Sequence, residues 1–551
     1  MKLFKKMMAL VVAMVMVLAM NVTAFADPDA KAADLTGHTY KAYQIFTGTQ
    51  AADDTTGKLA DVQWGTGINK DAFLTALKTT TTFGDTNPFA SCTTAEDVAN
   101  AMKGWADKSD NAKAFAKLAD QYKTGDGVDA AAGITTLDAG YYLVLDVTEF
   151  AGDAKDTVKN LALLQMTKKG TFDIENKTDI PEVEKKVADA NDTEDAAVTD
   201  PAEVAADDWK DSADHDVNDV IPYKLTGTLP TNYADYKTYN YEFTDVMCGG
   251  LTYNEDAKVY AVNNGTKTEI TSHATITGSG KGATLVVTFT DLKAITDATI
   301  NNNTKIVVEY TATLNGDAVM GATGNPNTVV LKYSNNPNYG GDGETGETPE
   351  DKVIVFTYKV DVNKVDQDNE DLAGAAFTLY KNYKGYTDDE ITAAEKTVVT
   401  AIKYNNDKNT YPIADGDKWV QVGTTTAGTA TDFAFERIDD GEYLLVETTT
   451  PSGYNAVKPS KFEVTATHTA GAVPELSTLS ATDSKGTSTD LGEITLTTED
   501  ENVGVETTII NQSGSTLPET GGIGTTIFYV LGAILVLGGT VVLVTRRRMA
   551  A

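Results

Sequence analysis

The chain has 551 residues, of which 45 are basic and 80 acidic, giving a formal net charge of −35. This charge argues against nucleic acid and anionic surfaces as partners, because their phosphates would repel it. The two cysteines, Cys92 and Cys248, are too few for a disulfide framework in a secreted chain of this size. We expect no cofactor and no metal site. The four histidines show neither metal-ligand nor triad spacing and are expected at the surface: His38, His215, His273 and His468.

The first 26 residues have the pattern of a secretory signal peptide. Lys2, Lys5 and Lys6 precede an apolar stretch over residues 7–20, and Ala24-Phe25-Ala26 offers a small-residue cleavage site. Removing this segment and the membrane anchor described below leaves about 490 residues, which is room for about three domains.

Residues 27–178 are predicted to form an N-terminal domain that mixes strands with helices. Residues 42–46 indicate a strand, and further strands are expected at 141–147 and 161–174. Between them, apolar residues recur at helical spacing over 98–105 and 115–122. Thr93 and Glu96 have the spacing of a capping box at the start of the first of these helices. The pattern predicts a β-domain with helical insertions.

The rest of the extracellular chain alternates apolar and polar residues. Residues 285–289, 306–310 and 329–333 show this period of two most clearly, and turns rich in Asn, Gly and Asp separate the short runs. We therefore expect two β-sandwich domains, over residues 179–337 and 352–512. Residues 338–351, which contain several glycines and a proline, are predicted to be a linker.

Residues 513–551 carry a pentapeptide, an apolar run from Ile523 to Val544 and a basic end, Arg546-Arg547-Arg548. The apolar run is long enough to cross a bilayer, and the arginines would keep the end cytoplasmic. This order resembles the LPxTG cell-wall sorting signal of Gram-positive surface proteins. The alternative is an ordinary membrane anchor preceded by a chance pentapeptide. The residues of the pentapeptide are Leu517, Pro518, Glu519, Thr520 and Gly521.

The sorting-signal resemblance implies that the chain is the substrate of a sortase. A sortase cysteine would attack the Thr520 carbonyl and release the chain from Gly521 onward, and the acyl-enzyme would then wait for an amine. The protein would be retained briefly in the membrane and then anchored to the cell wall.

The last sandwich carries a second motif. Residues 443–454 read YLLVETTTPSGY and resemble the E-box of Gram-positive pilins, YxLxETxAPxGY, with Thr450 where alanine is usual. The start and end of this domain resemble the first and last strands of collagen-adhesin B-type domains. In that family a lysine and an asparagine join in an intramolecular isopeptide bond, with the E-box glutamate as catalyst. The resemblance implies Lys364 and Asn511 as the bonded pair and Glu447 as the catalyst.

Strand parity supports the same three residues. Lys364, Glu447 and Asn511 each share a strand face with apolar residues two positions away, so we expect all three to face inward. Burial raises the pKa of a carboxyl group and lowers that of a lysine. A neutral amine could then attack the amide carbon while the protonated acid polarises its carbonyl. The alternative is a buried Lys–Glu ion pair with a hydrogen-bonded Asn.

The middle sandwich repeats the pattern with an aspartate. Residues 241–253 resemble the pilin middle domain, in which an aspartate replaces the glutamate. Asp245 and Asn327 lie on apolar strand faces. Lys185 and Lys186 compete for the third position, and parity selects Lys185 because its neighbours two positions away are valines. We expect a Lys185–Asn327 bond with Asp245 as its catalyst.

Polymerisation also needs an acceptor amine. In sortase-built pili this is the lysine of a pilin motif that closes the first domain. The equivalent stretch here, residues 172–178, lacks the usual Tyr-Pro and ends in Thr178 instead of asparagine. Parity leaves Lys177 facing solvent, which predicts Lys177 as the acceptor; the alternative is a plain surface lysine. A further trio in the first domain has no motif: Lys41, Asp146 and Asn176.

Taken over nearly the whole chain, the resemblance is to the major shaft pilins of sortase-assembled pili. It implies a mainly β fold of tandem immunoglobulin-like, Cna A/B-type sandwiches, CnaA-like in the middle domain and CnaB-like in the C-terminal domain. It also implies identical subunits joined head to tail. The implied partners are pilin-class and housekeeping sortases, minor and tip pilins, peptidoglycan and a host surface ligand. The alternative is a monomeric wall-anchored adhesin. An enzyme is not predicted, because we find no convincing nucleophile–base set.

Overall fold

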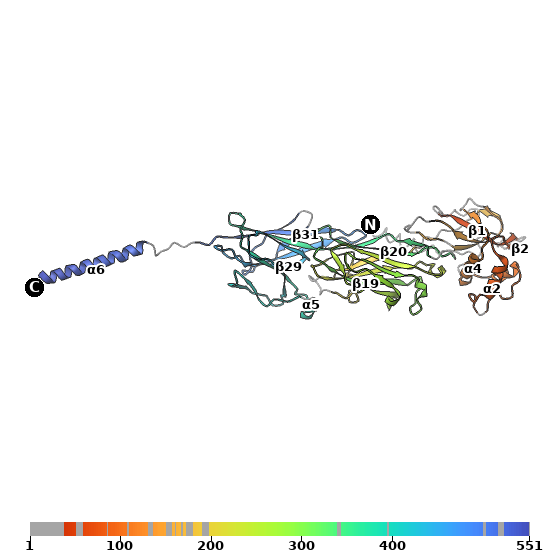
Figure 1. Ribbon diagram of the computed structural model, residues 1–551, viewed down its shortest axis with the longest axis horizontal. Coiled ribbons are helices and arrows are strands. Elements are labelled where there is room, and N and C mark those ends of the chain that lie inside the picture. The colour runs from red at the N-terminus through yellow and green to blue at the C-terminus, as the bar shows by residue number, and fades with distance from the viewer. Residues whose placement is uncertain are drawn as a thin grey trace.

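The structure is a computed structural model, and its described domains follow one another along the long axis, with a helix beyond the last (Figure 1). The signal peptide, Asn176, Lys177 and the pentapeptide 517–521 lie outside the described residues. The described residues are 38–50, 59–84, 86–106, 109–130, 136–149, 157–159, 161–166, 169–171, 180–189, 198–338, 343–393, 396–499, 503–515 and 523–549.

The N-terminal domain is a β-sheet with helices on one face, as the sequence predicts. Its sheet has the order β2-β1-β5-β6, with β3 paired to β1. The helices pack on the sheet through Phe73, Val98 and Phe115, and a smaller cluster around Tyr40 and Val144 covers the other face. The elements are β1 (Tyr40–Gln50), β2 (Leu59–Trp64), α2 (Lys70–Thr79), α3 (Ala95–Ala101), α4 (Asp110–Gln121), β3 (Val128–Ala130), β4 (Thr136–Leu137), β5 (Gly140–Asp146), β6 (Leu161–Met166) and β7 (Gly170–Thr171).

The capping box of α3 lies one residue later than predicted. The N-cap is Thr94, whose hydroxyl accepts the Asp97 N–H at 3.1 Å, while the Asp97 carboxylate accepts the Thr94 N–H at 2.9 Å. Asp97 also accepts the N–H and the hydroxyl of Thr93, and these hydrogen bonds lower its pKa to about 2. Thr93 with Glu96 and Thr94 with Asp97 have the same three-residue spacing. Because Thr94 and Asp97 form the capping box, Thr93 lies one residue before the N-cap.

The middle domain is a sandwich whose described strands form two sheets. One sheet has the order β10-β22-β20-β12-β18-β16, with β21 on β20, and the other has the order β15-β14-β19-β11-β8-β9, with β13 on β19 and β17 on β13. The alternation predicted over 285–289, 306–310 and 329–333 is confirmed, since alternate side chains there enter one shared core.

The strands of the middle domain are β8 (Val183–Ala188), β9 (Trp209–Lys210), β10 (Ser212–Asp214), β11 (Val220–Gly227), β12 (Tyr241–Met247), β13 (Leu251–Tyr253), β14 (Lys258–Asn263), β15 (Thr266–Glu269), β16 (Thr275–Thr277), β17 (Gly280–Lys281), β18 (Thr284–Phe289), β19 (Lys305–Leu314), β20 (Asn325–Ser334), β21 (Thr345–Glu347) and β22 (Asp351–Phe356).

The predicted linker, residues 338–351, contributes the strand β21 to this domain, and β22 begins at its last residue and extends into the predicted C-terminal domain. β21 and β22 pair with successive parts of β20, and β22 also pairs in parallel with β10. The domain boundary therefore falls at Thr357, between β22 and β23, and not at residue 352. Of the described residues that suggested a linker, Gly343 lies in the turn before β21, Gly346 lies within β21 and Pro349 lies between β21 and β22.

The C-terminal domain is a second sandwich. Its main sheets have the orders β28-β23-β33-β32 and β27-β24-β29-β30-β31, and a shared core lies between them. The first and last strands, β23 and β33, are parallel neighbours. The elements are β23 (Tyr358–Asp366), β24 (Ala376–Asn382), α5 (Asp388–Ala393), β25 (Ile402–Tyr404), β26 (Asn409–Tyr411), β27 (Trp419–Thr424), β28 (Asp432–Ile438), β29 (Gly441–Thr449), β30 (Ser460–His468), β31 (Leu476–Asp483), β32 (Leu496–Thr498) and β33 (Val505–Asn511).

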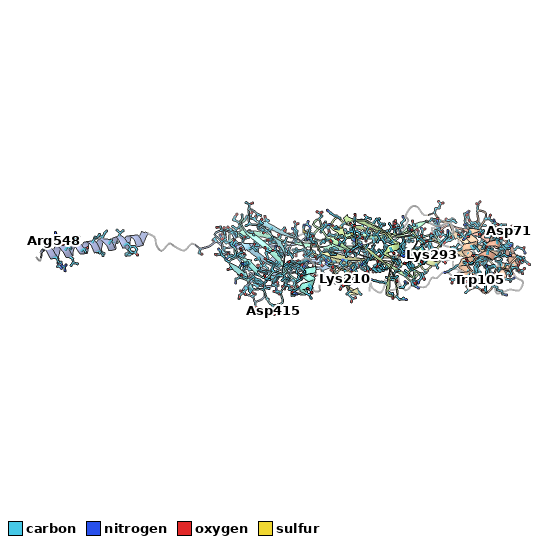
Figure 2. The ribbon with its side chains drawn as sticks, turned by 60° about the horizontal axis from the view of Figure 1, so that its bottom comes forward. Asp71, Trp105, Lys210, Lys293, Asp415 and Arg548 are labelled. Atoms are coloured by element: carbon cyan, nitrogen blue, oxygen red, sulfur yellow. The ribbon has the colours of Figure 1, made fainter. Side chains whose placement is uncertain are left out.

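The N-terminal and middle domains touch through polar contacts near Lys293 (Figure 2). On α4, Lys117 donates to the Ala234 carbonyl at 2.9 Å and Lys113 forms an ion pair with Asp235 at 3.6 Å. Asn338 donates to the Asp146 carbonyl at 3.0 Å. Contacts on both sides of the boundary hold the two domains against each other.

Beyond the C-terminal domain lies the helix α6 (Ile523–Met549), which ends in three arginines. Its part Phe528–Met549 has a mean hydropathy of 2.3 and is long and apolar enough to cross a membrane. Its described side chains are exposed. This agrees with the predicted anchor.

Candidate sites of intramolecular bond formation

In the C-terminal domain, the three residues predicted for the isopeptide site all face the interior. Lys364 on β23 and Asn511 on β33 are 0% exposed, and Glu447 on β29 of the opposite sheet is 2% exposed. β23 and β33 are adjacent, with Lys364 opposite Ile509 and Asp366 opposite Asn511. Strand parity therefore predicted these three orientations correctly.

The hydrogen bonds bring the amide of Asn511 to the acid. Asn511 Nδ2 donates to Glu447 Oε2 at 3.1 Å and to the Asn455 carbonyl at 2.7 Å. Lys364 Nζ donates to the carbonyls of Val365 at 2.7 Å and Ile509 at 3.1 Å. The amine is thus held at the backbone of the strand that carries Asn511, with no carboxylate bonded to it among the described residues.

The electrostatics of this site favour uncharged partners. Burial lowers the pKa of Lys364 to about 8, against the opposing effect of Glu447. Burial also raises the pKa of Glu447, which the hydrogen bond from Asn511 only partly offsets. Glu447 Oε1 and Asn511 Oδ1 are buried without a hydrogen-bond partner among the described residues. If Glu447 is protonated, its O–H group is a hydrogen-bond donor next to these two oxygen atoms, which otherwise have no donor.

Thr450, the residue that departs from the E-box pattern, contacts the acid directly. Its hydroxyl donates to Glu447 Oε2 at 2.9 Å, and the side chain is buried. An alanine could not make this bond. Sequence comparison with the motif located the departure, but only the structure assigns it a contact.

In the middle domain, the predicted trio is completely buried. Lys185 on β8, Asp245 on β12 and Asn327 on β20 are each 0% exposed. β12 and β20 are neighbours in one sheet, whereas β8 belongs to the sheet that faces them. Lys186 instead forms an ion pair with Asp211 near the surface. The choice of Lys185 by parity therefore gives the inward-facing lysine.

A tyrosine that the sequence analysis did not single out joins this trio. Lys185 Nζ forms an ion pair with Asp245 Oδ2 and donates to the Tyr310 hydroxyl at 2.9 Å. Tyr310 donates to Asp245 Oδ1 at 3.0 Å and accepts from Asn327 Nδ2 at 2.8 Å. In sequence, Tyr310 reads as one more apolar-face residue of β19, and no local pattern distinguishes it from a core aromatic residue.

Burial again shifts both titratable partners toward their neutral forms. It lowers the pKa of Lys185, against the opposing effect of Asp245, and it raises the pKa of Asp245, against that of Lys185. Neither shift alone decides between an ion pair and a reactive pair. The neutral pair is the form in which the amine has a free lone pair for attack.

In the trio considered for the first domain, Lys41 and Asp146 do not meet, and Asn176 lies outside the described residues. Tyr40 lies opposite Asp146 in the β1–β5 pairing, so Lys41 points to the other face. Lys41 pairs with Asp129 at 3.0 Å, while Asp146 binds His38 at 2.7 Å and the Thr148 hydroxyl at 2.6 Å. The bulge and the register of β1 were not visible in the sequence.

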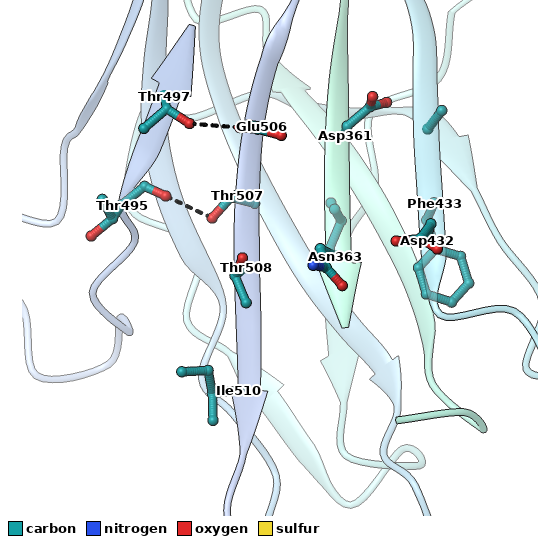
Figure 3. Close-up of a pocket in the computed structure, with 12 residues that line it drawn as sticks. Asp361, Asn363, Asp432, Phe433, Thr495, Thr497, Glu506, Thr507, Thr508 and Ile510 are labelled. Carbon is teal, nitrogen blue, oxygen red and sulfur yellow. Dashed lines mark hydrogen bonds between the residues drawn. The ribbon is translucent and has the colours of Figure 1, made fainter. Parts of the chain in front are cut away.

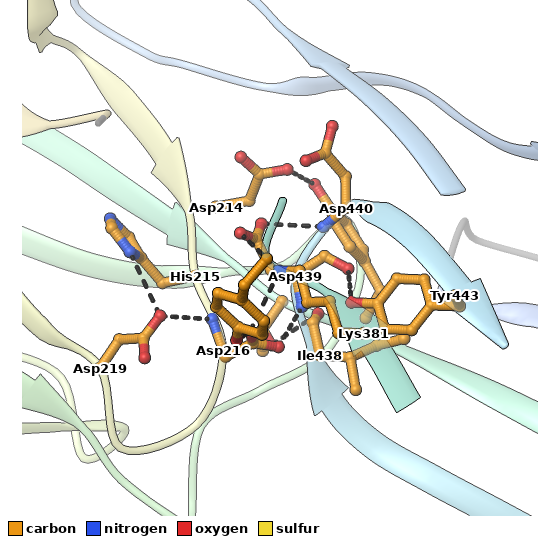
Figure 4. Close-up of polar contacts among 12 residues, drawn as sticks. Asp214, His215, Asp216, Asp219, Lys381, Ile438, Asp439, Asp440 and Tyr443 are labelled. Carbon is orange, nitrogen blue, oxygen red and sulfur yellow. Dashed lines mark hydrogen bonds and ion pairs between the residues drawn. The ribbon is translucent and has the colours of Figure 1, made fainter. Parts of the chain in front are cut away.

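A buried polar cluster lies where the middle and C-terminal domains meet (Figure 4). Lys381 Nζ on β24 contacts Asp216 Oδ2 of the middle domain at 3.1 Å and Asp439 Oδ2 at 3.2 Å. The Asp439 N–H also donates to Asp216 Oδ1 at 2.9 Å. All three side chains are buried. No pattern in the sequence indicates this cluster, because its members come from separate strands and loops.

Two histidines contribute to the same junction, which corrects their expected surface position. His215 is buried, and His468 at the end of β30 is largely buried. His468 forms an ion pair with Asp214 at 3.5 Å, and His215 lies 3.8 Å from Asp219. Burial opposes the charge of each histidine, but the nearby carboxylates outweigh it and raise both pKa values.

A shallow depression of about 860 Å³ lies on the outer face of the β28-β23-β33-β32 sheet. Figure 3 shows Asp361, Asn363 and Glu506 among its lining residues. These residues alternate along their strands with the inward-facing Lys364 and Asn511, so the depression and the buried trio lie on opposite faces of the sheet.

Three family models match consecutive parts of the chain. Residues 217–337 match the Gram-positive pilin backbone subunit 2, Cna-B-like domain, and residues 358–475 match the SpaA, prealbumin-like fold domain. Residues 509–550 match the LPXTG cell wall anchor motif. The Cna-B-like description of the middle domain differs from the A-type expected from sequence.

One curated relative and two solved structures are similar to this chain. The trypsin-resistant surface T6 protein of Streptococcus pyogenes serotype M6 is 25% identical over 387 residues, which cover 60% of this chain and 65% of the relative, less than two thirds of its length. Among solved structures, the T6 backbone pilin of S. pyogenes serotype M6 is 17% identical and covers 88% of this chain and 98% of its own, with a TM-score of 0.43.

The major pilin SpaD of Corynebacterium diphtheriae is also 17% identical and covers 90% of this chain and 95% of its own, with a TM-score of 0.38. The LPXTG match and the apolar helix α6 fit a surface protein that is held briefly in the membrane and then anchored to the cell wall. With a pilin backbone domain, a prealbumin-like domain and this anchor in order, the chain belongs to the backbone pilins of Gram-positive bacteria.

Proposed function

We propose that the chain is the shaft subunit of a sortase-polymerised pilus and that an intramolecular isopeptide bond reinforces each of its two sandwiches. The observation that best supports the bonds is that a lysine, a carboxylic acid and an asparagine are buried together in both sandwiches. Burying an unpaired charge in an apolar core costs free energy. A lysine, a carboxylic acid and an asparagine buried side by side are therefore expected to interact, and a covalent bond between the lysine and the asparagine removes the buried charge.

The chemistry in the C-terminal domain is an amide exchange. The neutral Lys364 Nζ attacks Asn511 Cγ while protonated Glu447 polarises the carbonyl. The new Nζ–Cγ bond forms, the Cγ–Nδ2 bond breaks, and a proton lost by Nζ leaves with Nδ2 as ammonia. The site excludes water, which strengthens the effect of the acid and holds the reacting groups together.

The placement of the bonds suits a fibre under tension. A Lys364–Asn511 bond would join the strands through which the chain enters and leaves the C-terminal domain. A Lys185–Asn327 bond would join the two sheets of the middle domain through its core. Each of the two sandwiches would then carry tension through a covalent bond. Without this bond, only hydrogen bonds between the strands would resist the force.

For assembly, a pilin-class sortase would transfer the Thr520 carbonyl of one subunit to Lys177 of the next, and a housekeeping sortase would attach the last subunit to peptidoglycan. Minor and tip pilins and a host ligand would be further partners. The acyl-enzyme formed at Thr520 needs an amine, and Lys177 is the candidate on sequence grounds.

Denaturing gels of cell-wall extracts test this assembly. The wild-type protein should give a covalent ladder, and Lys177→Ala should abolish it while the monomer is still secreted. Lys169→Ala is the matched control, since Lys169 is a well-exposed lysine near residue 177 in the sequence and pairs with Asp138. A ladder that persists in Lys177→Ala would refute Lys177 as the acceptor, and a wild-type protein without a ladder would favour a monomeric adhesin.

A further inference from the structure

The hydroxyl of Tyr310 touches all three groups of the middle-domain trio. It lies 2.9 Å from Lys185 Nζ, 3.0 Å from Asp245 Oδ1 and 2.8 Å from Asn327 Nδ2. Its ring is 1% exposed and stacks on Tyr223 at a centroid distance of 5.2 Å and an interplanar angle of 9°. The ring packing fixes the oxygen between the amine, the acid and the amide.

The hydrogen-bonding capacity of this hydroxyl is fully used. One O–H proton goes to Asp245, and the two lone pairs accept from Lys185 and Asn327. A tyrosine placed only to fill the core needs no such arrangement. The neighbouring Tyr223 shows this, since its hydroxyl is buried without a hydrogen-bond partner among the described residues.

The two sites also differ in which groups contact the asparagine. In the C-terminal domain Glu447 is itself hydrogen-bonded to the Asn511 amide nitrogen. In the middle domain Asp245 interacts with the side chains of Lys185, Tyr310 and Asn327. Unlike in the C-terminal domain, a tyrosine hydroxyl also accepts the hydrogen bond from the asparagine amide nitrogen, here that of Asn327.

We propose that Tyr310 is a catalytic residue of the middle-domain reaction and carries a proton from Lys185 Nζ to the departing Nδ2 of Asn327. This inference rests on the proposed Lys185–Asn327 bond. The same oxygen contacts the atom that must lose a proton and the atom that must gain one, so a single hydroxyl can serve both without any movement of the strands.

The step balances without another reactant. Neutral Lys185 Nζ bonds to Asn327 Cγ, and the tetrahedral carbon then expels Nδ2. Nζ gives one proton to the Tyr310 oxygen as Tyr310 gives its own proton to Nδ2, which leaves as ammonia. Tyr310 ends in its original protonation state, and Asp245 keeps its proton while it stabilises the charge that develops on the carbonyl oxygen.

Tyr310→Phe removes the hydroxyl and keeps the ring. The expected result is slower formation of the Lys185–Asn327 branched peptide, by about 10²–10⁴-fold as is typical for loss of a general acid–base group. Peptide mapping at intervals after a pulse of labelled amino acid measures this rate. Tyr223→Phe is the matched control and should react at the wild-type rate, because that hydroxyl makes no hydrogen bond among the described residues.

The outcomes separate the two claims. A wild-type protein without the branched peptide would refute the proposed bond itself. A wild-type rate in Tyr310→Phe, with the bond present in both proteins, would overturn the role of Tyr310 and leave the bond standing. The Lys364–Asn511 branched peptide, measured in the same digest, reports whether the C-terminal domain of each variant has folded, and hydrogen exchange of β19 reports the same for the middle domain.

A second substitution covers the case in which Tyr310→Phe fails to fold. Replacing Tyr310 by a fluorinated tyrosine keeps the ring and the hydroxyl but makes the phenol more acidic. If the hydroxyl transfers a proton, the rate of bond formation changes with the acidity of the phenol. An unchanged rate across analogues of different acidity would contradict proton transfer by Tyr310.

Discussion

Lys364 and Asn511 lie on neighbouring parallel strands that begin and end the C-terminal domain, and Lys364 Nζ donates to the carbonyl of Ile509, two residues before Asn511. Tension on the two ends of the domain would pull β23 and β33 in opposite directions along the strands, which loads their shared hydrogen bonds in shear. A covalent link between these strands would prevent them from sliding apart. The pairing also explains why the reactive residues sit so close to the ends of the domain.

Glu447→Ala should prevent the Lys364–Asn511 bond, because it removes the acid that would polarise the Asn511 carbonyl. Intact-mass measurement should show the variant one ammonia heavier than expected from the wild-type mass and the substitution. By analogy with a disulfide that closes a loop of similar size, the loss should lower the free energy of unfolding by about 5 kcal/mol.

The matched control for this measurement is Glu442→Ala on the same strand, since Glu442 pairs with Lys461 at 2.7 Å away from the trio. Glu442→Ala should keep the ammonia deficit. An equal deficit in Glu447→Ala would remove Glu447 from the mechanism.

Thr450→Ala should raise the pKa of Glu447 further. The Thr450 hydroxyl donates to Glu447 Oε2 at 2.9 Å and so favours the carboxylate form. Without it, the acid stays protonated to a higher pH. A Lys364→Met background, in which no bond can form, allows the Glu447 carboxyl to be titrated by carbon NMR with and without Thr450. A lower or unchanged pKa in Thr450→Ala would contradict this reading of the contact.

Lys381→Met should weaken the junction between the middle and C-terminal domains. It removes the cation that lies between the buried carboxylates of Asp216 and Asp439, and breaking a buried pair in this way typically costs about 3–5 kcal/mol. Thermal unfolding of the full extracellular chain measures the loss. Lys384→Met, three residues further along the chain, just beyond β24 and well exposed, is the control and should change little. Equal stability of both variants would show that the cluster does not hold the junction.

The junction should also loosen as the pH rises. Burial opposes the charge of His468, but Asp214 outweighs it, so folding raises the His468 pKa; Asp189 and Asp440 act in the same direction. The stabilisation is therefore fully present below the ordinary histidine pKa of about 6.5 and is lost as the pH passes the raised value.

Hydrogen exchange of β10 and β30 between about pH 6 and pH 8 tests this dependence across the ordinary histidine range. His468→Gln should reduce the change in exchange, and the remainder would come from His215, whose pKa is raised beside Asp219. His273→Gln, at an exposed pair with Asp297 in the middle domain, is the control. Protection that increases with pH in the wild-type protein would contradict the sign of this argument.

The sequence predicted the buried trios because strand parity is a local property. Lys364, Glu447 and Lys185 could be assigned to a face from residues two positions away, and burial follows once the sheets pack. Parity cannot show which strands become neighbours. The pairing of β22 with β20, the bulge in β1 that turns Lys41 outward and the meeting of Lys381 with Asp216 all depend on tertiary contacts.

The sequence also does not predict the contacts of two hydroxyl groups, those of Tyr310 and Thr450. Tyr310 and Thr450 read as a core aromatic residue and as a departure from a motif, because nothing in their neighbours indicates a polar partner. Their roles depend on a single atom at hydrogen-bond distance from an acid on another strand. Such contacts follow from the packing of whole sheets and leave no periodic signal in the chain.

The intact mass of the secreted wild-type protein tests the central claim most directly. Each Lys–Asn bond releases one ammonia, so the account predicts a mass lower than that of the processed sequence by two ammonia molecules, with branched peptides joining Lys185 to Asn327 and Lys364 to Asn511. A mass equal to that of the processed sequence, with all four segments recovered as linear peptides, would contradict it.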